Sequence, residues 1–416
     1  MHQAASPNEV SPMTPGQREF LEILKHTMHP VPNHVQYDDT IDWTSVFGEA
    51  VNQNLLPLIY NAASDYPGFS EFDEAHPENM MHTVKMVSAQ AQRTSAFLAL
   101  YRAFLEAGIS PIVVKGIVCR SLYGELQDFR LSGDEDILIE PKDFEAVDEV
   151  LNAHGYHTDE VADRDMATVQ EVTFCNEETG LTVEVHLNPF GESNPVRSKM
   201  NMWFRDSFAS AEALEMEGVQ LRVLSPTENL LFLLFHAFKH FLAAGMGVRL
   251  VLDALLYMEK YSDCVDWKDI IRALEDVRAT TFAADLIAIG NKYLGFDLAI
   301  EGLNQPVSPD ELLEDMLLRG TFGVSTQIDA DVARFTELAV EGKRGSKITD
   351  TFYLIFPSWD QWKSFKPYLV DRPWMLPVEW FRRVGRYLRK RKAVDLSESR
   401  RIAERRIELM KRYGVV

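Results

Sequence analysis

Residues 134–140 read Asp-Glu-Asp-Ile-Leu-Ile-Glu and combine a strand-like apolar pattern with four carboxylates. Successive side chains of a strand point to opposite faces, so Asp134 and Asp136 share one face and Glu135 lies on the other. Two like charges at this spacing repel each other, and burying them is costly unless a cation neutralises them. Mg²⁺ or Mn²⁺ would do so and keep coordination positions open for water and phosphate oxygens. The pair therefore predicts a metal site for phosphoryl or nucleotidyl transfer.

A lysine and a glycine earlier in the chain are of types that suit phosphate binding. Lys115 and Gly116 lie where a short apolar run, Pro-Ile-Val-Val, turns into a predicted helix over residues 117–126. The first N–H groups of a helix carry a partial positive charge and bind anions. Glycine lets a phosphate approach the backbone, and lysine adds a full positive charge. This turn is therefore predicted to bind phosphate.

A third carboxylate is predicted on a later strand. The sequence around the turn Asn-Glu-Glu-Thr-Gly predicts a hairpin, and its second strand is Leu-Thr-Val-Glu-Val-His-Leu, residues 181–187. Alternation puts apolar side chains on one face, namely Val183, Val185 and Leu187, and the polar ones on the other, namely Thr182, Glu184 and His186. Glu184 is thus a candidate third acid for the metal.

The elements that must position these residues form a small α/β unit between two helical regions. Apolar residues recur with helical spacing over residues 17–107 and again after about residue 225. Strand, helix, strand, helix and hairpin follow one another in between, which predicts an α+β fold with a small mixed sheet. The expected divisions are a disordered leader (1–16), an N-terminal helical region (17–107), the core (108–205), a helical domain (206–345), and an aromatic-rich segment with a basic helical tail (346–416).

The composition of the chain is typical of a globular protein of two or three domains, with 416 residues, 46% hydrophobic and 25% charged. The first residues lack the features of a signal peptide, and no stretch approaches the roughly 18 consecutive apolar residues that a membrane helix needs. The three cysteines are far apart in sequence and indicate neither a disulfide framework nor a zinc ribbon. These observations predict a cytoplasmic protein without a membrane span.

Charge is distributed unevenly along the chain. Residues 381–416 carry a net charge of +9, which leaves −30 for residues 1–380 out of the total of −21. The acidic body argues against a general nucleic-acid clamp, because phosphates would be repelled over most of the surface. The tail is predicted either to contact a polyanion or anionic surface, or to dock on the acidic body.

The order of these residues resembles the uncharacterised nucleotidyltransferase family within the DNA polymerase beta-like superfamily. The resemblance runs from about Ile41 to Tyr261 and continues more faintly to the tail. The family's pattern is Lys-Gly, a Tyr in the following helix, Arg, Asp-x-Asp, and a later Glu-x-His. The matching residues are Lys115, Gly116, Tyr123, Arg130, Asp134, Asp136, Glu184 and His186. The resemblance implies a minimal nucleotidyltransferase core, in which the two aspartates and the third acid hold two metals against a nucleoside triphosphate.

Two positions depart from the pattern of the wider superfamily. Lys115 and Gly116 stand where a Gly-Ser pair is usual, a variation shared with this branch. Glu135 stands between the aspartates, where an apolar residue is usual. The strand face that bears Glu135 is therefore expected to border solvent or a basic partner.

Other polar residues have more than one interpretation. Arg130 is expected to bind phosphate or to form a structural ion pair. His236 and His240 lie i, i+4 on an apolar helix; they are either core histidines or, together with Lys239, contacts for the nucleotide or acceptor, as the resemblance favours. A zinc site is disfavoured because the motif lacks the Glu of a metalloprotease and a third ligand. Arg249 and Asp253 are also i, i+4 and are expected to form an intrahelical ion pair.

The sequence as a whole predicts an Mg²⁺- or Mn²⁺-dependent nucleotidyltransferase. An acceptor hydroxyl or similar group would attack the α-phosphate of a nucleoside triphosphate and release pyrophosphate. Asp134 and Asp136 would bind both metals, Glu184 would bind the catalytic metal and help deprotonate the nucleophile, and Lys115 with the Gly116 N–H would hold the β- and γ-phosphates. The acceptor, whether a small molecule, a protein or tRNA, is not readable from the sequence. The rival hypothesis is a nucleotide-sensing or scaffold protein that keeps the fold but is catalytically weak.

Overall fold

The computed structural model describes residues 13–30, 41–158, 170–191, 195–243, 245–320, 327–340, 342, 356, 369, 372–390 and 396–416. Most of the predicted leader and most of the aromatic-rich segment lie outside these residues. The chain divides into two compact units. The first comprises Met1–Phe238 and Gly247–Thr321, and the second comprises Lys239–Met246 and Phe322–Val416.

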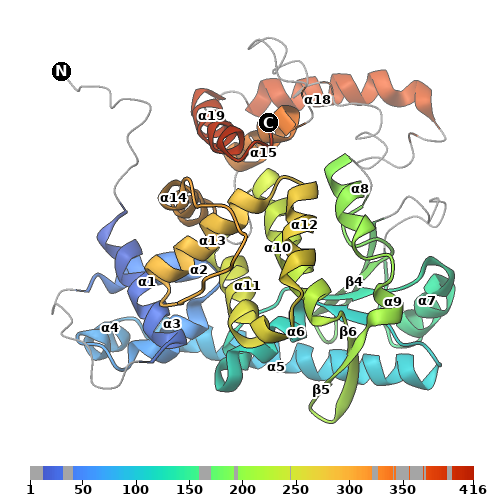
Figure 1. The fold of residues 1–416 in the computed structure, drawn as a ribbon, viewed down its shortest axis with the longest axis horizontal. Helices are drawn as coiled ribbons and strands as arrows, with labels where there is room; N and C mark the ends of the chain where they lie inside the picture. The colour runs from blue at the N-terminus through green and yellow to red at the C-terminus, as the bar shows by residue number, and fades with distance from the viewer. Residues whose placement is uncertain are drawn as a thin grey trace. The chain divides into compact units, whose positions relative to one another are not determined.

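The first unit contains a six-stranded mixed sheet, drawn toward the right-hand side of Figure 1. Its strands are β1 (Ile112–Val114), β2 (Glu135–Leu138), β3 (Glu171–Asn176), β4 (Leu181–His186), β5 (Glu212–Met216) and β6 (Val219–Val223). Their order in the sheet is β3-β4-β2-β1-β6-β5. β2 is parallel to β4 and antiparallel to β1, and β1 is parallel to β6. This mixed sheet among helices confirms the predicted α+β class.

The hairpin of β5 and β6 was not predicted, because it falls within residues 206–345, where helices were expected. More and less buried residues alternate along β6. The turn between the two strands, Glu217-Gly218, has positive φ at both residues (47° and 74°). Positive φ at both central positions is the requirement of the two-residue turns that join twisted antiparallel strands. The hairpin extends the sheet by two strands beyond β1.

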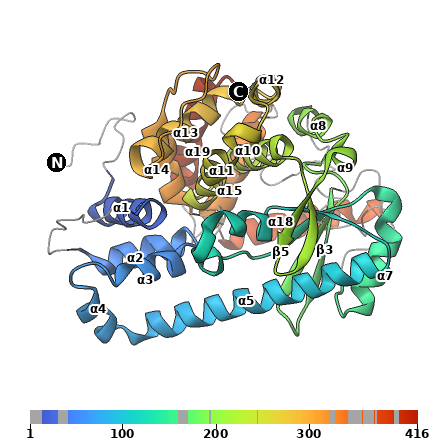
Figure 2. The same ribbon diagram turned by 60° about the horizontal axis from the view of Figure 1, so that its bottom comes forward.

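In the described residues before the sheet the chain forms helices, as the periodicity of residues 17–107 predicted: α1 (Pro15–Met28), α2 (Trp43–Asn52), α3 (Leu56–Ala63), α4 (Phe69–Ala75) and α5 (Pro77–Glu106). A capping box at Thr14 and Gln17 begins α1. The long helix α5 runs along one face of the sheet (Figure 2). Its second half buries Phe97, Tyr101 and Phe104 in the same core as Ile137 of β2.

Two shorter helices cover this same apolar face. α6 (Gly116–Arg120) follows β1 directly, and α7 (Phe144–Ala153) follows β2 through a 3-10 turn at Pro141–Asp143. α6 is shorter than the predicted helix, because the chain continues as a 3-10 segment, Ser121–Phe129, interrupted at Gly124 by a non-helical φ of 57°. Side chains of α5, α6 and α7 thus form one core with the sheet, which leaves the opposite face of β2 and β4 for polar residues.

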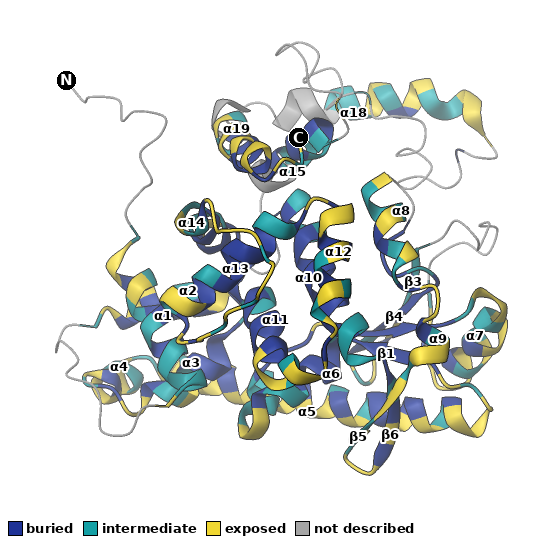
Figure 3. Ribbon diagram, viewed as in Figure 1, coloured by how far each residue is buried: buried dark blue, intermediate teal, exposed yellow. Residues whose placement is uncertain are grey.

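Two short helices, α8 (Pro195–Met202) and α9 (Ser207–Ser210), lie between β4 and β5. Longer helices return after β6, as predicted: α10 (Pro226–Leu242), α11 (Val248–Tyr261), η3 (Ser262–Cys264), α12 (Trp267–Asp276), α13 (Thr280–Tyr293) and α14 (Pro309–Arg319). α11 is among the most deeply buried elements of the first unit (Figure 3). In the described part of the chain, no helix has the length and apolarity needed to cross a membrane.

The second unit contains α15 (Gln327–Val340), η5 (Pro373–Met375), α18 (Leu376–Lys390) and α19 (Leu396–Arg412). α15 and α19 pack together through Val332, Phe335 and Ala403. Arg406 is buried and donates to the carbonyl oxygens of Phe241 and Ala243 at 2.5 and 3.0 Å. At least this arginine of the basic tail therefore serves the fold of the unit.

Candidate functional site

The site is formed by the polar face of two neighbouring strands. β2 and β4 run parallel in a register that pairs Asp136 with Glu184 and Leu138 with His186. Residues paired in this way point to the same side of the sheet, so the alternation read from the sequence brings the acids together. Side-chain ligand atoms of Asp136, Glu184 and His186 all lie within 4.8 Å of one another.

Asp136 is the centre of the polar contacts. Its Oδ1 atom accepts hydrogen bonds from His186 Nε2 at 2.8 Å and from Lys115 Nζ at 2.7 Å. The same His186 nitrogen lies 3.6 Å from Glu184 Oε2, and His186 Nδ1 lies 3.4 Å from Glu171 Oε2. Asp136 is fully buried and His186 nearly so, so these contacts are screened little by water.

The pKa shifts follow from these contacts. Burial of Asp136 favours its neutral form, but Lys115 and His186 outweigh this and lower the pKa of the carboxyl group. Burial opposes protonation of His186, yet its hydrogen bonds to Asp136 and Glu184 raise the pKa of the imidazole to about 9. Burial is likewise outweighed at Lys115, where Asp136 raises the pKa of the ammonium. At neutral pH an ionised Asp136 therefore faces two protonated groups.

The residues present fit a divalent cation. The second carboxylate oxygen of Asp136, Oδ2, is buried and has no hydrogen-bond partner among the residues that the structure describes. A buried carboxylate oxygen without a partner is costly, and a metal ion would satisfy it. Asp136 and Glu184 offer the oxygen ligands that Mg²⁺ and Mn²⁺ prefer, and His186 would be a ligand only after losing the proton that it donates to Asp136.

Asp134 has a different position from its partner in the motif. It lies just before the first residue of β2 and is outside the group of three ligands within 4.8 Å. Burial, followed by the charge of Asp136, raises the pKa of its carboxyl group. This shift is what a second carboxylate near an ionised one experiences, so the expected repulsion between Asp134 and Asp136 is present.

Glu135 occupies the opposite face of β2 and is buried there. Its Oε2 accepts the backbone N–H of Ile117 at 2.7 Å, and its Oε1 accepts from Arg120 Nη1 at 2.6 Å. This face was expected to border solvent or a basic partner. The structure instead has a basic side chain of the chain itself, Arg120, beside Glu135. The carboxylate thus occupies a backbone donor at the start of α6.

The turn at Lys115 and Gly116 is shaped by the same carboxylate. Lys115 has φ 53° and Gly116 has φ 35°, both in the left-handed region. A Cβ atom added at Gly116 would lie 2.0 Å from Glu135 Oε2. Glycine is therefore required here because a larger residue would collide with Glu135. This reason differs from the predicted close approach of a phosphate to the backbone.

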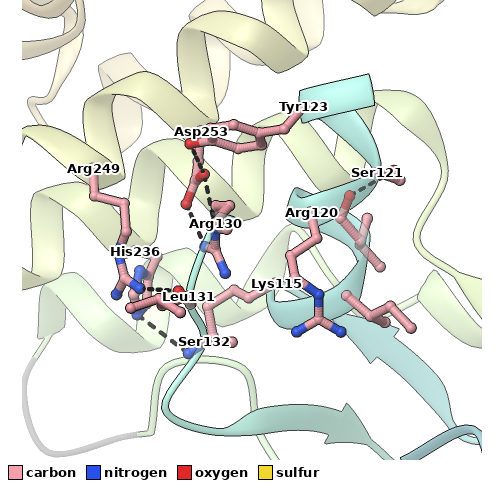
Figure 4. A network of polar contacts seen from close by, with 12 residues as sticks. Lys115, Arg120, Ser121, Tyr123, Arg130, Leu131, Ser132, His236, Arg249 and Asp253 are labelled. Carbon is pink, nitrogen blue, oxygen red and sulfur yellow. Dashed lines mark hydrogen bonds and ion pairs between the residues drawn. The ribbon is translucent and has the colours of Figure 1, made fainter. Parts of the chain in front are cut away.

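A second polar network lies beside Lys115 (Figure 4). Arg130 donates to both oxygens of Asp253, at 2.5 Å to Oδ2 and 3.2 Å to Oδ1, and the Tyr123 hydroxyl donates to Oδ1 at 2.8 Å. The structure thus gives Arg130 the ion pair that was one of its two interpretations. The predicted intrahelical pair of Arg249 with Asp253 is wrong: Asp253 is taken by Arg130, and Arg249 donates to the carbonyl oxygen of Leu131.

The predicted histidine helix contributes one contact to the site. His236 of α10 is buried, and its Nε2 lies 3.4 Å from Lys115 Nζ. Lys239 and His240 belong to the second compact unit, so their nucleotide or acceptor contacts stay predictions. Among the candidates, four lie in one cluster of side-chain contacts: Lys115, Asp136, Glu184 and His236.

Sequence reasoning missed His186 as a site residue. It was matched to the family pattern but was given no role, although its position two residues after Glu184 puts it on the same strand face. That spacing could have identified it. Glu171, which lies beside His186 on β3, could not be assigned without knowing the register of the hairpin.

Residues 39–295 match the model of a family described as uncharacterised nucleotidyltransferase. This range is more than half of the chain and contains the complete site, so the chain belongs to this family. No curated protein and no solved structure matches the sequence. The family and the acid–histidine cluster together support nucleotidyl transfer as the general class of activity.

Proposed function

We propose that this protein is a metal-dependent nucleotidyltransferase that moves a nucleoside monophosphate from a nucleoside triphosphate to an acceptor hydroxyl or similar group, with release of pyrophosphate. The observation that carries the proposal is the buried Oδ2 of Asp136, which has no hydrogen-bond partner in the described part of the chain. Potential ligand atoms of Asp136, Glu184 and His186 nevertheless lie within 4.8 Å of one another. Membership of the nucleotidyltransferase family supports the reaction class.

Asp136 and Glu184 are the residues that would hold Mg²⁺ or Mn²⁺, together with Asp134 beside them. Such a cation, when bound, stabilises the charge on the transferred phosphate and lowers the pKa of the attacking group. His186 orients Asp136 through the hydrogen bond to Oδ1. A hydrogen-bonded ligand is held in one geometry, which raises its affinity for the metal.

The remaining roles belong to the chain's own polar groups. Glu184 is partly exposed, with 24% of its side chain accessible, whereas Asp136 is fully buried. The accessibility of Glu184 suits this carboxylate to accept the proton of an acceptor hydroxyl. Lys115 and the Gly116 N–H would bind the β- and γ-phosphates, because the ammonium already lies at the rim of the carboxylate cluster.

A nucleotide-sensing protein with weak catalysis is the rival proposal. One observation favours it: Lys115 and His186 neutralise Asp136 without a metal. A sensor would bind triphosphate and metal but would leave the triphosphate intact. Nucleotidyl transfer and sensing therefore differ in one product, pyrophosphate.

Incubation with each radiolabelled nucleoside triphosphate and Mn²⁺ or Mg²⁺ tests the proposal, with pyrophosphate release and self-labelling as readouts. Transfer predicts pyrophosphate release that requires the metal and is lost in Asp136→Asn. Binding of triphosphate without any pyrophosphate, in the presence of candidate hydroxyl acceptors, would instead support the sensor.

A further inference from the structure

Basic side chains from four separate segments lie near Lys115 and Asp253. Lys115 follows β1, Arg130 precedes β2, His236 lies on α10 and Arg249 lies on α11. Figure 4 shows these four side chains together. The contact between Lys115 and His236, and the mutual electrostatic effects of Arg130, Arg249 and Asp134, place them in one region.

Three of these groups have counterparts within the protein. Lys115 donates to Asp136, and Arg130 is paired with Asp253. His236 contacts Lys115. Their charges and hydrogen bonds are therefore largely accounted for by the fold.

Arg249 differs from the others. It donates to the carbonyl oxygen of Leu131, but it forms no ion pair with any carboxylate in the described part of the chain. Its Nε atom is shielded from solvent and has no hydrogen-bond partner. Burial, and the nearby charge of Arg130, lower the pKa of this guanidinium. Asp253 and Asp134 act on this charge without forming an ion pair with it, and an anion at this position would supply a direct partner.

The location of Arg249 indicates the type of anion. Arg249 donates to the carbonyl oxygen of Leu131 and its charge acts on Asp134, so the guanidinium lies near the segment that leads into β2. Its side chain is partly exposed, which leaves it open to a ligand. A guanidinium has a planar fork of donors that matches two phosphate oxygens, and arginine is favoured over lysine for this geometry.

We propose that Arg249 binds the terminal phosphates of the triphosphate and thereby selects a polyphosphate chain over a monophosphate. This rests on the proposed function, since it assigns a ligand to the same site. Lys115 would contact the same phosphates from the β1–α6 turn. Arg249 is thus a binding residue that neither the motif nor the spacing of the sequence identified.

A purely structural role for Arg249 makes a different prediction. Its bond to Leu131 would then only hold the segment between Arg130 and Asp134 in place. Loss of the side chain would loosen the acids themselves, so that every ligand that depends on the metal would bind more weakly. A phosphate role would affect only ligands that have β- and γ-phosphates.

Calorimetric titration of the full chain with ATP, AMP and inorganic pyrophosphate, each with Mn²⁺, separates these roles. We expect Arg249→Gln to weaken ATP and pyrophosphate binding by about 10- to 100-fold, as for loss of a charge-assisted hydrogen bond, with AMP binding unchanged. Arg249→Lys should recover only part of the loss, because it keeps the charge without the fork. Arg272→Gln, an exposed arginine on α12, is the control and should bind as the wild type does.

Each outcome decides a different claim, provided that thermal unfolding and circular dichroism show folded variants. An equal loss for AMP, ATP and pyrophosphate would overturn the phosphate role in favour of the structural one, and so would ATP affinity that Arg249→Gln leaves unchanged. If Arg249→Gln does not fold, Arg249→Lys carries the comparison alone. Pyrophosphate binding that depends on Arg249, in a protein that releases none from any triphosphate, would keep this site and refute transfer.

Discussion

The two faces of β2 each bury an acid beside a cation, and they differ in what is left over. Glu135 accepts two hydrogen bonds, one at each carboxylate oxygen: from the backbone N–H of Ile117 and from the guanidinium of Arg120. Asp136, the next residue, receives Lys115 and His186 on one oxygen and leaves the other without a partner. A carboxylate with both oxygens satisfied serves the fold, whereas a buried oxygen without a partner indicates a place for a ligand.

The difference predicts that two neighbouring substitutions affect activity differently. Asp136→Asn should reduce pyrophosphate release by on the order of 10³-fold, because it removes the charge that holds the metal. Its free energy of unfolding should also fall, because Lys115 and His186 lose their buried counter-charge, so turnover is compared only for protein that circular dichroism shows to be folded. Steady-state assays with Mn²⁺ measure the loss, and turnover near the wild-type level would show that Asp136 is not a metal ligand.

Glu135→Gln should instead act on stability. The amide leaves the buried Arg120 without its counter-charge, so the free energy of unfolding should fall by about 3 kcal/mol. Urea unfolding followed by circular dichroism provides the measurement. Glu140→Gln, at the end of the same segment, breaks an exposed pair with Lys142 and should cost less than about 1 kcal/mol. Equal effects of the two variants would mean that burial does not distinguish the acids.

Glu184→Gln tests the acid that is partly exposed on the Asp136 face. Binding of the triphosphate should persist, because Asp136 and Lys115 remain, while turnover should fall by on the order of 10²-fold through loss of the base-like group. Glu177→Gln and Glu178→Gln, in the turn between β3 and β4, serve as controls and should have normal turnover. Loss of binding and turnover together would assign Glu184 to ligand binding alone.

The smallest effect is expected from the basic tail. Deleting residues 381–416 would also remove α19 and its buried Arg406, so substitution of exposed arginines is a cleaner test. A variant with Arg401, Arg405 and Arg412 changed to Gln should elute from heparin at lower salt if this surface contacts a polyanion.

The control for the tail changes three exposed basic residues of the first unit, Lys142, Arg272 and Lys292, to Gln. This variant has the same net charge as the tail variant but an intact α19. Identical elution of both variants and the wild type would remove the polyanion hypothesis.

The sequence was sufficient to predict the parts of the site that depend on alternation. Residues on one strand face follow a period of two, so the sharing of a face by Glu184 and His186 is fixed locally. The fold class was predictable because helix-like and strand-like patterns follow one another along the chain. The Lys-Gly turn was predictable because an apolar strand-like run ends just before it. Strand order was not, and the pairing of β2 with β4 that joins Asp136 to Glu184 emerges only from the register of the sheet.

Contacts between distant segments could not be predicted. Arg130 and Asp253 are 123 residues apart, and their pairing depends on how α11 packs against the segment before β2. Sequence spacing favoured Arg249 as the partner of Asp253 because i, i+4 neighbours on a helix lie close together. The actual pairing releases Arg249 from that role, and the close approach of Glu135 to Gly116 likewise arises from the packing of α6 on the sheet.

Metal-dependent binding of a triphosphate tests the central claim most directly. Calorimetric titration of the wild type with ATP should show binding with Mn²⁺ and none with EDTA, and Asp136→Asn should lose the metal-dependent binding while Glu140→Gln keeps it. Equal affinity of the wild type and Asp136→Asn for ATP in the presence of Mn²⁺ would contradict the assignment of the Asp136 face as the site.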